Sequence, residues 1–190
     1  MTDRKFPKIV GLIGHARSGK TTTANIMAEK GYVRIPFAEP MKAMLKLGFG
    51  LTDGDLNGTA KEEPSERLLG VSPRYALQTL GTEWGRNLIG KRVWLVAWLN
   101  MVEKTGAQHV VADDVRFLNE IELIRDMGGE IFEVAAPAAD AIPLKHHVSE
   151  IEWTKADPDW TIINDGGIED LRRRVEGALY GVSSPIEEPA

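Results

Sequence analysis

The sequence contains no cysteine, which excludes disulfide bonds, thiolate metal sites and a cysteine nucleophile. It also contains no long apolar run, because the longest, residues 93–99, is far shorter than the roughly 20 residues that a membrane span requires. Residues 1–8 are polar and charged, with no apolar signal core behind them. We therefore expect a soluble, cytoplasmic protein that does not act at a membrane.

An excess of positive charge is also lacking. The chain has 23 Lys and Arg against 28 Asp and Glu, which gives a net charge of −5 and a pI near 5.5. A protein with this balance is a poor candidate for general binding to nucleic acids or anionic membranes, unless its positive charge is gathered locally. We therefore expect small-molecule substrates and no nucleic-acid polymer as a partner.

What is present is an ordinary globular composition, 43% hydrophobic and 27% charged over 190 residues. A chain of this length is expected to form one domain and to bury about 70% of its unfolded surface. Strands are predicted at residues 8–13, 32–37, 109–112, 130–135 and 160–163, and helices at 21–30, 40–49, 73–89, 92–105, 117–127 and 168–179. This alternation predicts an α/β fold whose parallel sheet, of about five strands, is covered by helices on both faces.

Three segments stand apart from this alternation or add to it. Residues 50–72 have no clear period and contain several Gly, Asp and Glu, so we expect an irregular surface excursion. Residues 92–105 are apolar on nearly every side, which predicts a helix buried within the domain or facing a second subunit of a homodimer. The tail, residues 181–190, is predicted to be disordered.

Residues 14–21 (GHARSGKT) fit the phosphate-loop pattern GxxxxGK[ST], follow a predicted apolar strand and open a predicted helix. In such a loop the glycines let backbone N–H groups surround phosphate oxygens, Lys20 reaches the β- and γ-phosphates, and Thr21 ligates Mg²⁺. The helix that begins there adds its positive dipole end. The predicted nucleoside triphosphate site comprises Gly14, Ala16, Ser18, Gly19, Lys20, Thr21 and Thr22.

A carboxylate at the end of a neighbouring strand is the second requirement of such a site. Asp113 and Asp114 directly follow the apolar run 110–112. We expect this pair to serve the metal or the phosphates, while one of the two could instead cap the following helix. The sequence leaves open which aspartate holds the metal.

The predicted helix 73–89 carries an unusual face. At about 100° per residue, Arg74, Gln78, Gly81 and Gly85 lie on one side, opposite an apolar stripe of Ala76, Leu77, Leu80, Trp84 and Leu88. Glycine within a helix costs about 1 kcal/mol relative to alanine, so either a ligand or another helix must approach closely there. Arginine and glutamine over a cleared surface suit an anionic, planar, hydrogen-bonding ligand, whereas close helix packing is the alternative.

Several sequence blocks together resemble the deoxynucleoside monophosphate kinases encoded by bacteriophages. They occur in that family's order and span roughly residues 8–180. The blocks are the phosphate loop, 37–42 (FAEPMK), 72–86 (SPRYALQTLGTEWGR), 114–120 (DVRFLNE), 147–150 (HVSE) and 164–166 (NDG). The helix with arginine, glutamine and glycine and the DVRF block are the specific ones, since the phosphate loop alone indicates only a P-loop protein.

The resemblance implies a P-loop kinase fold, a three-layer α/β/α sandwich, that transfers the γ-phosphoryl group of ATP to a deoxynucleoside monophosphate with Mg²⁺. It implies one domain over residues 1–180, with a substrate-binding insert at about 38–92 and a lid-like segment at about 136–150. It also implies that Arg116 meets a phosphate and that Arg74, Gln78 and Arg86 bind the monophosphate. The remaining predicted substrate-side residues are Lys42, Gly81, Trp84 and Glu150. A virus-encoded kinase of this kind would act in the host cytoplasm.

Phosphoryl transfer between nucleotides depends on cations more than on a general base, and the predicted lid contains no arginine. We hypothesise that Arg17, within the phosphate loop, supplies part of the missing charge beside Lys20, Arg116 and Asp114 in the catalytic set. Asn164 and Gly166 lie where P-loop kinases commonly lodge adenine, although a plain turn explains them equally well. The pair His146 and His147 lacks the partners that a metal site needs.

Two other classes of function compete with this interpretation. A P-loop kinase of another phosphorylated metabolite, of the phosphomevalonate or dephospho-coenzyme A type, would share the loop and the Asp-x-Arg arrangement. A nucleotide-dependent switch would need an Asn-Lys-x-Asp motif, which the sequence lacks, and a nucleic-acid motor would need a longer chain and a basic track.

Overall fold

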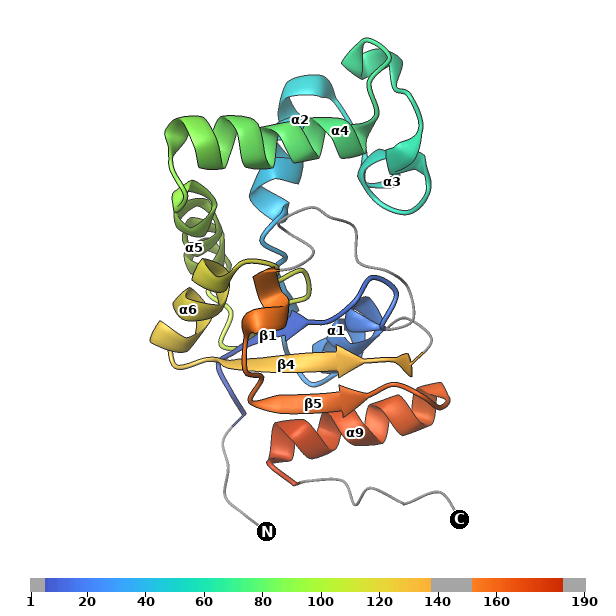
Figure 1. Cartoon of the computed structure of the whole chain (residues 1–190), viewed down its shortest axis with the longest axis vertical. Coiled ribbons are helices and arrows are strands. Elements are labelled where there is room, and N and C mark those ends of the chain that lie inside the picture. The colour runs from blue at the N-terminus through green and yellow to red at the C-terminus, as the bar shows by residue number, and fades with distance from the viewer. Residues whose placement is uncertain (1–5, 138–151, 183–190) are drawn as a thin grey trace. The chain divides into compact units, whose positions relative to one another are not determined.

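A computed structural model of the chain describes residues 6–137 and 152–182 (Figure 1). The chain divides into two compact units. Unit 1 draws on residues 1–36 and 106–190, and unit 2 comprises Phe37–Thr105. The expected substrate-binding insert falls within unit 2, which also includes the following apolar helix.

Unit 1 is built on one parallel sheet. Its strands are β1 (Ile9–Ile13), β2 (Val33–Arg34), β3 (Val110–Ala112), β4 (Glu130–Ala135) and β5 (Trp160–Ile163). They pair in the order β2-β3-β1-β4-β5, and every pairing is parallel. The expected five-stranded parallel sheet is confirmed, although β2 is much shorter than the predicted strand 32–37.

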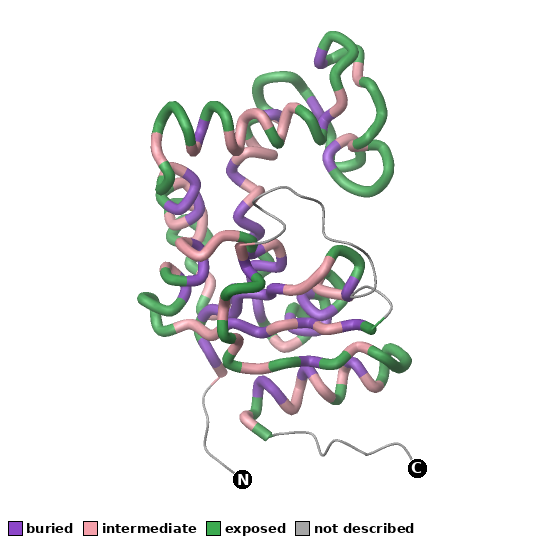
Figure 2. Tube along the Cα trace, in the orientation of Figure 1, coloured by how far each residue is buried: buried purple, intermediate pink, exposed green. Residues whose placement is uncertain are grey.

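Helices cover both faces of this sheet, as predicted. They are α1 (Lys20–Glu29), α6 (Leu118–Asp126) and α9 (Ile168–Tyr180), accompanied by the 3₁₀ turn η4 (Glu152–Lys155). Val10 and Leu12 of β1 belong to the core that contains the buried side of α1 and α9. Gly11 points the other way, where an added Cβ would lie 2.6 Å from Ile124 of α6. Successive residues of a strand face opposite sides, so the buried β1 separates two helical layers (Figure 2).

The order of the strands creates a topological switch point between β1 and β3. The chain leaves β1 into α1 on one face and leaves the adjacent β3 toward α6 on the other face. Ligands of open α/β sheets bind outside the carboxyl ends of strands at such a switch point. The phosphate loop after β1 and the two aspartates after β3 therefore both lie at this switch point.

Unit 2 is helical. It comprises α2 (Glu39–Phe49), α3 (Asp53–Leu56), the 3₁₀ turns η1 (Ala60–Glu62) and η2 (Glu66–Leu68), α4 (Pro73–Thr79), the π-helix η3 (Leu80–Ile89) and α5 (Val93–Thr105). The segment expected to be irregular, 50–72, instead contains three short helical elements. Its leucines Leu51, Leu56 and Leu68 join Leu45 in a small core of their own.

The helix predicted at 73–89 begins as expected, because the Ser72 hydroxyl caps it and Pro73 occupies its first turn. From Leu80 onward, however, it is a π-helix, so the 100° rotation assumed for the whole segment is wrong there. The Gly81 carbonyl accepts a hydrogen bond of 2.8 Å from the Trp94 indole, a side-chain donor that enters the ladder of the helix. No periodicity of the sequence reveals such a donor.

The change of helix type splits the predicted apolar stripe. Ala76, Leu77 and Leu80 pack against the leucine core of unit 2, as expected. Trp84 and Leu88 stay 40% and 76% exposed, so the prediction that they are buried is wrong. A π-helix has more residues per turn than an α-helix, so Trp84 and Leu88 no longer align with the apolar side chains of α4.

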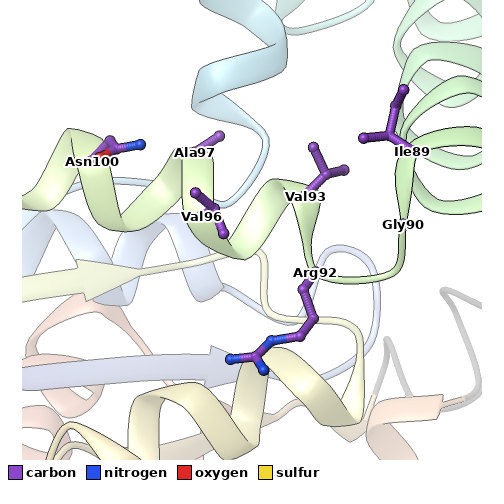
Figure 3. A pocket seen from close by; sticks show the side chains of 7 residues that line it. All are labelled: Ile89, Gly90, Arg92, Val93, Val96, Ala97 and Asn100. Atoms are coloured by element: carbon purple, nitrogen blue, oxygen red, sulfur yellow. The ribbon is translucent and has the colours of Figure 1, made fainter.

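Helix α5 is buried on one side only. Trp94, Leu95 and Trp98 are buried, and the Trp98 ring stacks on Phe37 with centroids 4.5 Å apart. Val96 is 56% exposed, which corrects the expectation that the helix is buried all round. A hollow of about 450 Å³ lies along the side that bears Val96. Residues of α5 and of the end of η3 line it (Figure 3).

The two glycines of η3 admit side chains of unit 2 itself. An added Cβ at Gly85 would lie 2.2 Å from Trp94 Nε1, and one at Gly81 would lie 3.1 Å from Met41 Sδ. The sequence left two explanations open for the cleared face, and at Gly85 the structure shows close packing by Trp94. Gly81 serves the packing of Met41 in the same way.

We expect Gly85→Ala to lower the free energy of unfolding by about 1–3 kcal/mol, because the methyl group overlaps a buried indole. Urea denaturation measures this change. Gly48→Ala is the matched control, since Gly48 lies in α2 with nothing within 4 Å of an added Cβ. The control is expected to stabilise the protein by up to about 1 kcal/mol. Equal stability of Gly85→Ala and the wild type would contradict the packing described.

Candidate active site

The phosphate loop joins β1 to α1 through backbone conformations that require glycine. Gly14 has φ 135°, and an added Cβ there would lie 2.4 Å from the Val134 carbonyl oxygen. Gly19, with φ 105°, is the N-cap of α1. Arg17 also has a positive φ, 69°, without being glycine. Such left-handed backbone in a larger residue is strained and is typical of functional loops.

The Lys20 ammonium lies against its own loop. Its Nζ donates to the carbonyl oxygens of Gly14 at 2.7 Å and of His15 at 2.6 Å. The His15 ring in turn contacts the buried Trp153 of η4 edge to face, with centroids 5.3 Å apart. The loop thus holds its cation at the start of α1, where the helix dipole is also positive.

Asp113 is the aspartate that reaches the loop. Its Oδ2 accepts a hydrogen bond of 3.0 Å from the Thr21 hydroxyl and lies 2.7 Å from an Arg34 guanidinium nitrogen. Its Oδ1 is buried and has no hydrogen-bond partner within residues 6–137 and 152–182. Asp114 is only partly buried.

A divalent cation fits the residues at this place. Magnesium prefers carboxylate and hydroxyl oxygens, and the Asp113 carboxylate and Thr21 hydroxyl supply both side by side. A buried carboxylate oxygen without a donor is costly, so a cation or its water shell would satisfy Oδ1. The geometry therefore favours Asp113 over Asp114 as the residue that would hold the metal.

The turn after β3 is fixed by a buried carboxylate that the sequence reasoning did not single out. Glu120 is 3% exposed, and its Oε2 accepts the backbone N–H groups of Arg116 at 2.8 Å and Phe117 at 3.1 Å. This is the return half of a capping box at the start of α6. The backbone of Arg116 is thereby held, while its side chain is exposed.

Asn164 follows β5 and is tied to the phosphate loop. Its Nδ2 donates to the Ser18 carbonyl at 2.8 Å and lies 2.4 Å from the position of an added Cβ on Gly19. Its backbone N–H donates to the Ala135 carbonyl at 2.6 Å. The sequence analysis offered an adenine site or a plain turn for Asn164, and neither interpretation included this contact, in which the side-chain amide supports the phosphate loop.

The residues after Asn164 secure the start of α9. Gly166 lies against Asp170, whose carboxylate accepts the Gly167 N–H at 3.2 Å. A hydrogen bond from Arg173, together with this N–H, holds the pKa of Asp170 below its ordinary value. The carboxylate is therefore ionised at neutral pH, and it interacts favourably with the positive N-terminal end of α9.

The predicted acceptor-side residues lie in unit 2. The Arg74 Nε is 2.5 Å from Glu62 Oε1 on η1, and both side chains are about half exposed. Arg86 Nη1 is 3.5 Å from the Lys91 carbonyl. Gln78 is exposed on α4.

Two further predicted residues have partners within the same unit. Lys42 Nζ donates to Asn57 Oδ1 at 2.9 Å, and the Trp84 ring lies 5.9 Å from that of Trp94. Glu62 was absent from the predictions, since nothing in an isolated charged segment signals its pairing with Arg74.

Some predictions fall on residues outside the described part of the chain. These are Glu150, the pair His146 and His147, and nearly all of the lid-like segment and tail. Among the described residues, no group of three or more His, Cys, Asp or Glu could by itself hold a metal ion. No helix within those residues is long and apolar enough to cross a membrane.

The chain is similar in sequence to known kinases. A family model for deoxynucleotide monophosphate kinases matches residues 66–175, more than half of the chain. A protein of Acanthamoeba polyphaga mimivirus, provisionally named a deoxynucleotide monophosphate kinase, is 30% identical over 193 residues, covering 92% of this chain and 97% of the relative. The deoxynucleoside-5′-monophosphate kinase of Escherichia phage T5 is 45% identical over 56 residues, covering 30% of this chain and 22% of that protein. Among solved structures, dephospho-CoA kinase from Campylobacter jejuni is 12% identical with a TM-score of 0.46, covering 92% of this chain and 98% of that one.

We expect Asn164→Ala to weaken binding of a non-hydrolysable ATP analogue about three- to tenfold, the cost of one hydrogen bond that supports the loop. Calorimetric titration measures the dissociation constant. Asn100→Ala, which removes an exposed amide from α5, is the control and should leave it unchanged. Unaltered affinity in Asn164→Ala would show that the Ser18 contact does not shape the loop.

Proposed function

The chain belongs to the deoxynucleotide monophosphate kinase family, and from that premise we propose that it transfers the γ-phosphoryl group of ATP to a deoxynucleoside 5′-monophosphate. The contact between Thr21 and Asp113 carries the proposal, because it joins the phosphate loop to a carboxylate suited to hold the nucleotide's Mg²⁺. The two sequence relatives named above come from viruses. We infer that the protein acts on small molecules in the cytoplasm of a host.

The reaction needs little proton chemistry. The second pKa of a phosphate monoester is near 6, so the attacking oxygen of a monophosphate is already mostly ionised at pH 7. The difficulty is to bring two anions together and to stabilise the charge on the group in transit. Cations and alignment, rather than a general base, are what the protein must provide.

The donor side of this chemistry belongs to unit 1. Lys20 and the N–H groups of the phosphate loop would bind the triphosphate, and Thr21 with Asp113 would hold Mg²⁺. When bound, Mg²⁺ neutralises charge on the β- and γ-phosphates. Arg116 extends from a turn that Glu120 fixes, which supports a role in contacting a phosphate.

The acceptor side belongs to unit 2. Arg74 and Arg86 are suited to a phosphate because guanidinium groups bind its oxygens in pairs, and Gln78 can hydrogen-bond a base edge. Arg74 pairs with Glu62, and this exposed ion pair is weak enough to be exchanged for a phosphate. Lys42, Gly81 and Trp84 complete the proposed acceptor residues that the structure describes.

A panel of acceptors tests the function. With ATP and Mg²⁺, we expect saturable ADP release with at least one deoxynucleoside monophosphate, and little with dephospho-coenzyme A or phosphomevalonate. Arg74→Met should raise KM for the monophosphate at least about tenfold and leave ATP affinity unchanged, because it removes a charged hydrogen-bonding group from the acceptor-binding residues alone. Turnover only with another metabolite, or ATP hydrolysis stimulated by DNA without an acceptor, would overturn the proposal.

We expect Arg17→Ala to lower kcat about 100-fold or more and to change ATP affinity less than about threefold, because charge on the group in transit exists only during transfer. Steady-state kinetics and ATP titration give the two quantities. Arg17→Gly separates the guanidinium from the backbone, since glycine tolerates the φ of 69° without strain. A kcat that stays at the wild-type value in both variants would remove Arg17 from the catalytic set.

A further inference from the structure

Arg34, a residue that no motif of the sequence singled out, lies at the proposed metal site. One of its guanidinium nitrogens is 2.7 Å from Asp113 Oδ2. The Asp113 side chain is 3% exposed and that of Arg34 is 37% exposed. The same Oδ2 also accepts the hydroxyl of Thr21. One carboxylate oxygen thus meets both the phosphate loop and an arginine.

The sheet fixes Arg34 in this position. Arg34 is the last residue of β2 and pairs with Val111 of β3, while the N–H groups on either side of it donate to the β3 chain. Asp113 is two residues beyond Val111, and side chains two residues apart share one face of a strand. The arginine at the edge strand therefore extends to the carboxylate that follows its neighbour.

The single negative charge of the Asp113 carboxylate is too little to balance both Arg34 and a divalent cation. A buried aspartate needs a counter-charge, and Arg34 provides it while the metal is absent. A divalent cation bound to Asp113 would bring its own charge within a few ångströms of the guanidinium, and like charges in a partly buried place repel strongly. Oδ1 is left for the divalent cation, but the guanidinium on Oδ2 would repel that cation, so each of the two positive charges weakens the binding of the other to Asp113.

We propose that Arg34 is the counter-ion of Asp113 in the metal-free protein and competes with the divalent cation for this carboxylate. The inference rests on the proposed function only in taking Thr21 and Asp113 as the residues that hold the metal. Arg34 keeps Asp113 in contact with Thr21 before any ligand arrives, so the site is formed in advance. The same pairing weakens binding of a bare cation, which favours a cation that arrives with the phosphates of a nucleotide.

Binding of Mn²⁺ to the full chain tests the proposal without any measurement of turnover. We expect Arg34→Met to lower the dissociation constant of Mn²⁺ alone about tenfold, because the competing charge is gone, and to lower it less in the presence of a non-hydrolysable ATP analogue, whose phosphates offset that charge. Electron paramagnetic resonance of free Mn²⁺ gives this constant. Arg172→Met is the control. It removes the same charge from the ion pair between Arg172 on α9 and Glu29 on α1, and it should leave Mn²⁺ binding unchanged.

A double-mutant cycle separates competition at Asp113 from a general effect of charge. In an Asp113→Asn background, Arg34→Met is expected to have no further effect on Mn²⁺ affinity, because the shared carboxylate is lost. An equal effect in both backgrounds, or weaker Mn²⁺ binding in Arg34→Met, would overturn the proposal. Arg34→Lys keeps a charge and the fold, and should lie between wild type and Arg34→Met. An acceptor panel without activity would count against the proposed function, whereas an unchanged Mn²⁺ titration counts against Arg34 alone.

Discussion

A buried carboxylate between two strand ends is the constraint on which the rest of unit 1 depends. Asp113 is almost fully buried at the end of β3, where an unpaired charge is costly. The protein meets this cost with a hydroxyl from the phosphate loop and a guanidinium from the edge strand. Because Thr21 follows β1, Arg34 ends β2 and Asp113 follows β3, these contacts also fix the ends of the three strands relative to one another.

Cations held by the protein's own oxygen atoms recur in both units. Lys20 contacts the carbonyls of its loop, Arg34 contacts Asp113, and Arg74 contacts Glu62. Each arrangement orders a long side chain before a phosphate or metal binds, which reduces the entropy lost on binding. In the function proposed above, the internal partner of each side chain would compete with the ligand. The resulting balance favours a ligand of high charge, such as a nucleotide phosphate, over a weakly charged one.

Much of the fold could be predicted because it follows from local patterns. The apolar runs of β4 and β5, the glycine after α1 and the Ser72–Pro73 cap each act within a few residues of chain. The failures occurred where distant side chains decide the outcome. The Trp94 indole enters the ladder of η3, and four leucines spread from 45 to 68 form a core, so neither feature has a local period.

The sequence by itself determined the phosphate loop, the parallel sheet and the family, because glycine spacing, apolar alternation and a specific helix motif are written along the chain. Only the tertiary structure brought Asp113 to Thr21 and Asn164 to Ser18, and set Arg34 beside the Asp113 carboxylate. These contacts join residues 79 to 146 positions apart. A sheet brings such residues together by pairing strands out of chain order, and the order of pairing depends on the whole core rather than on any one segment.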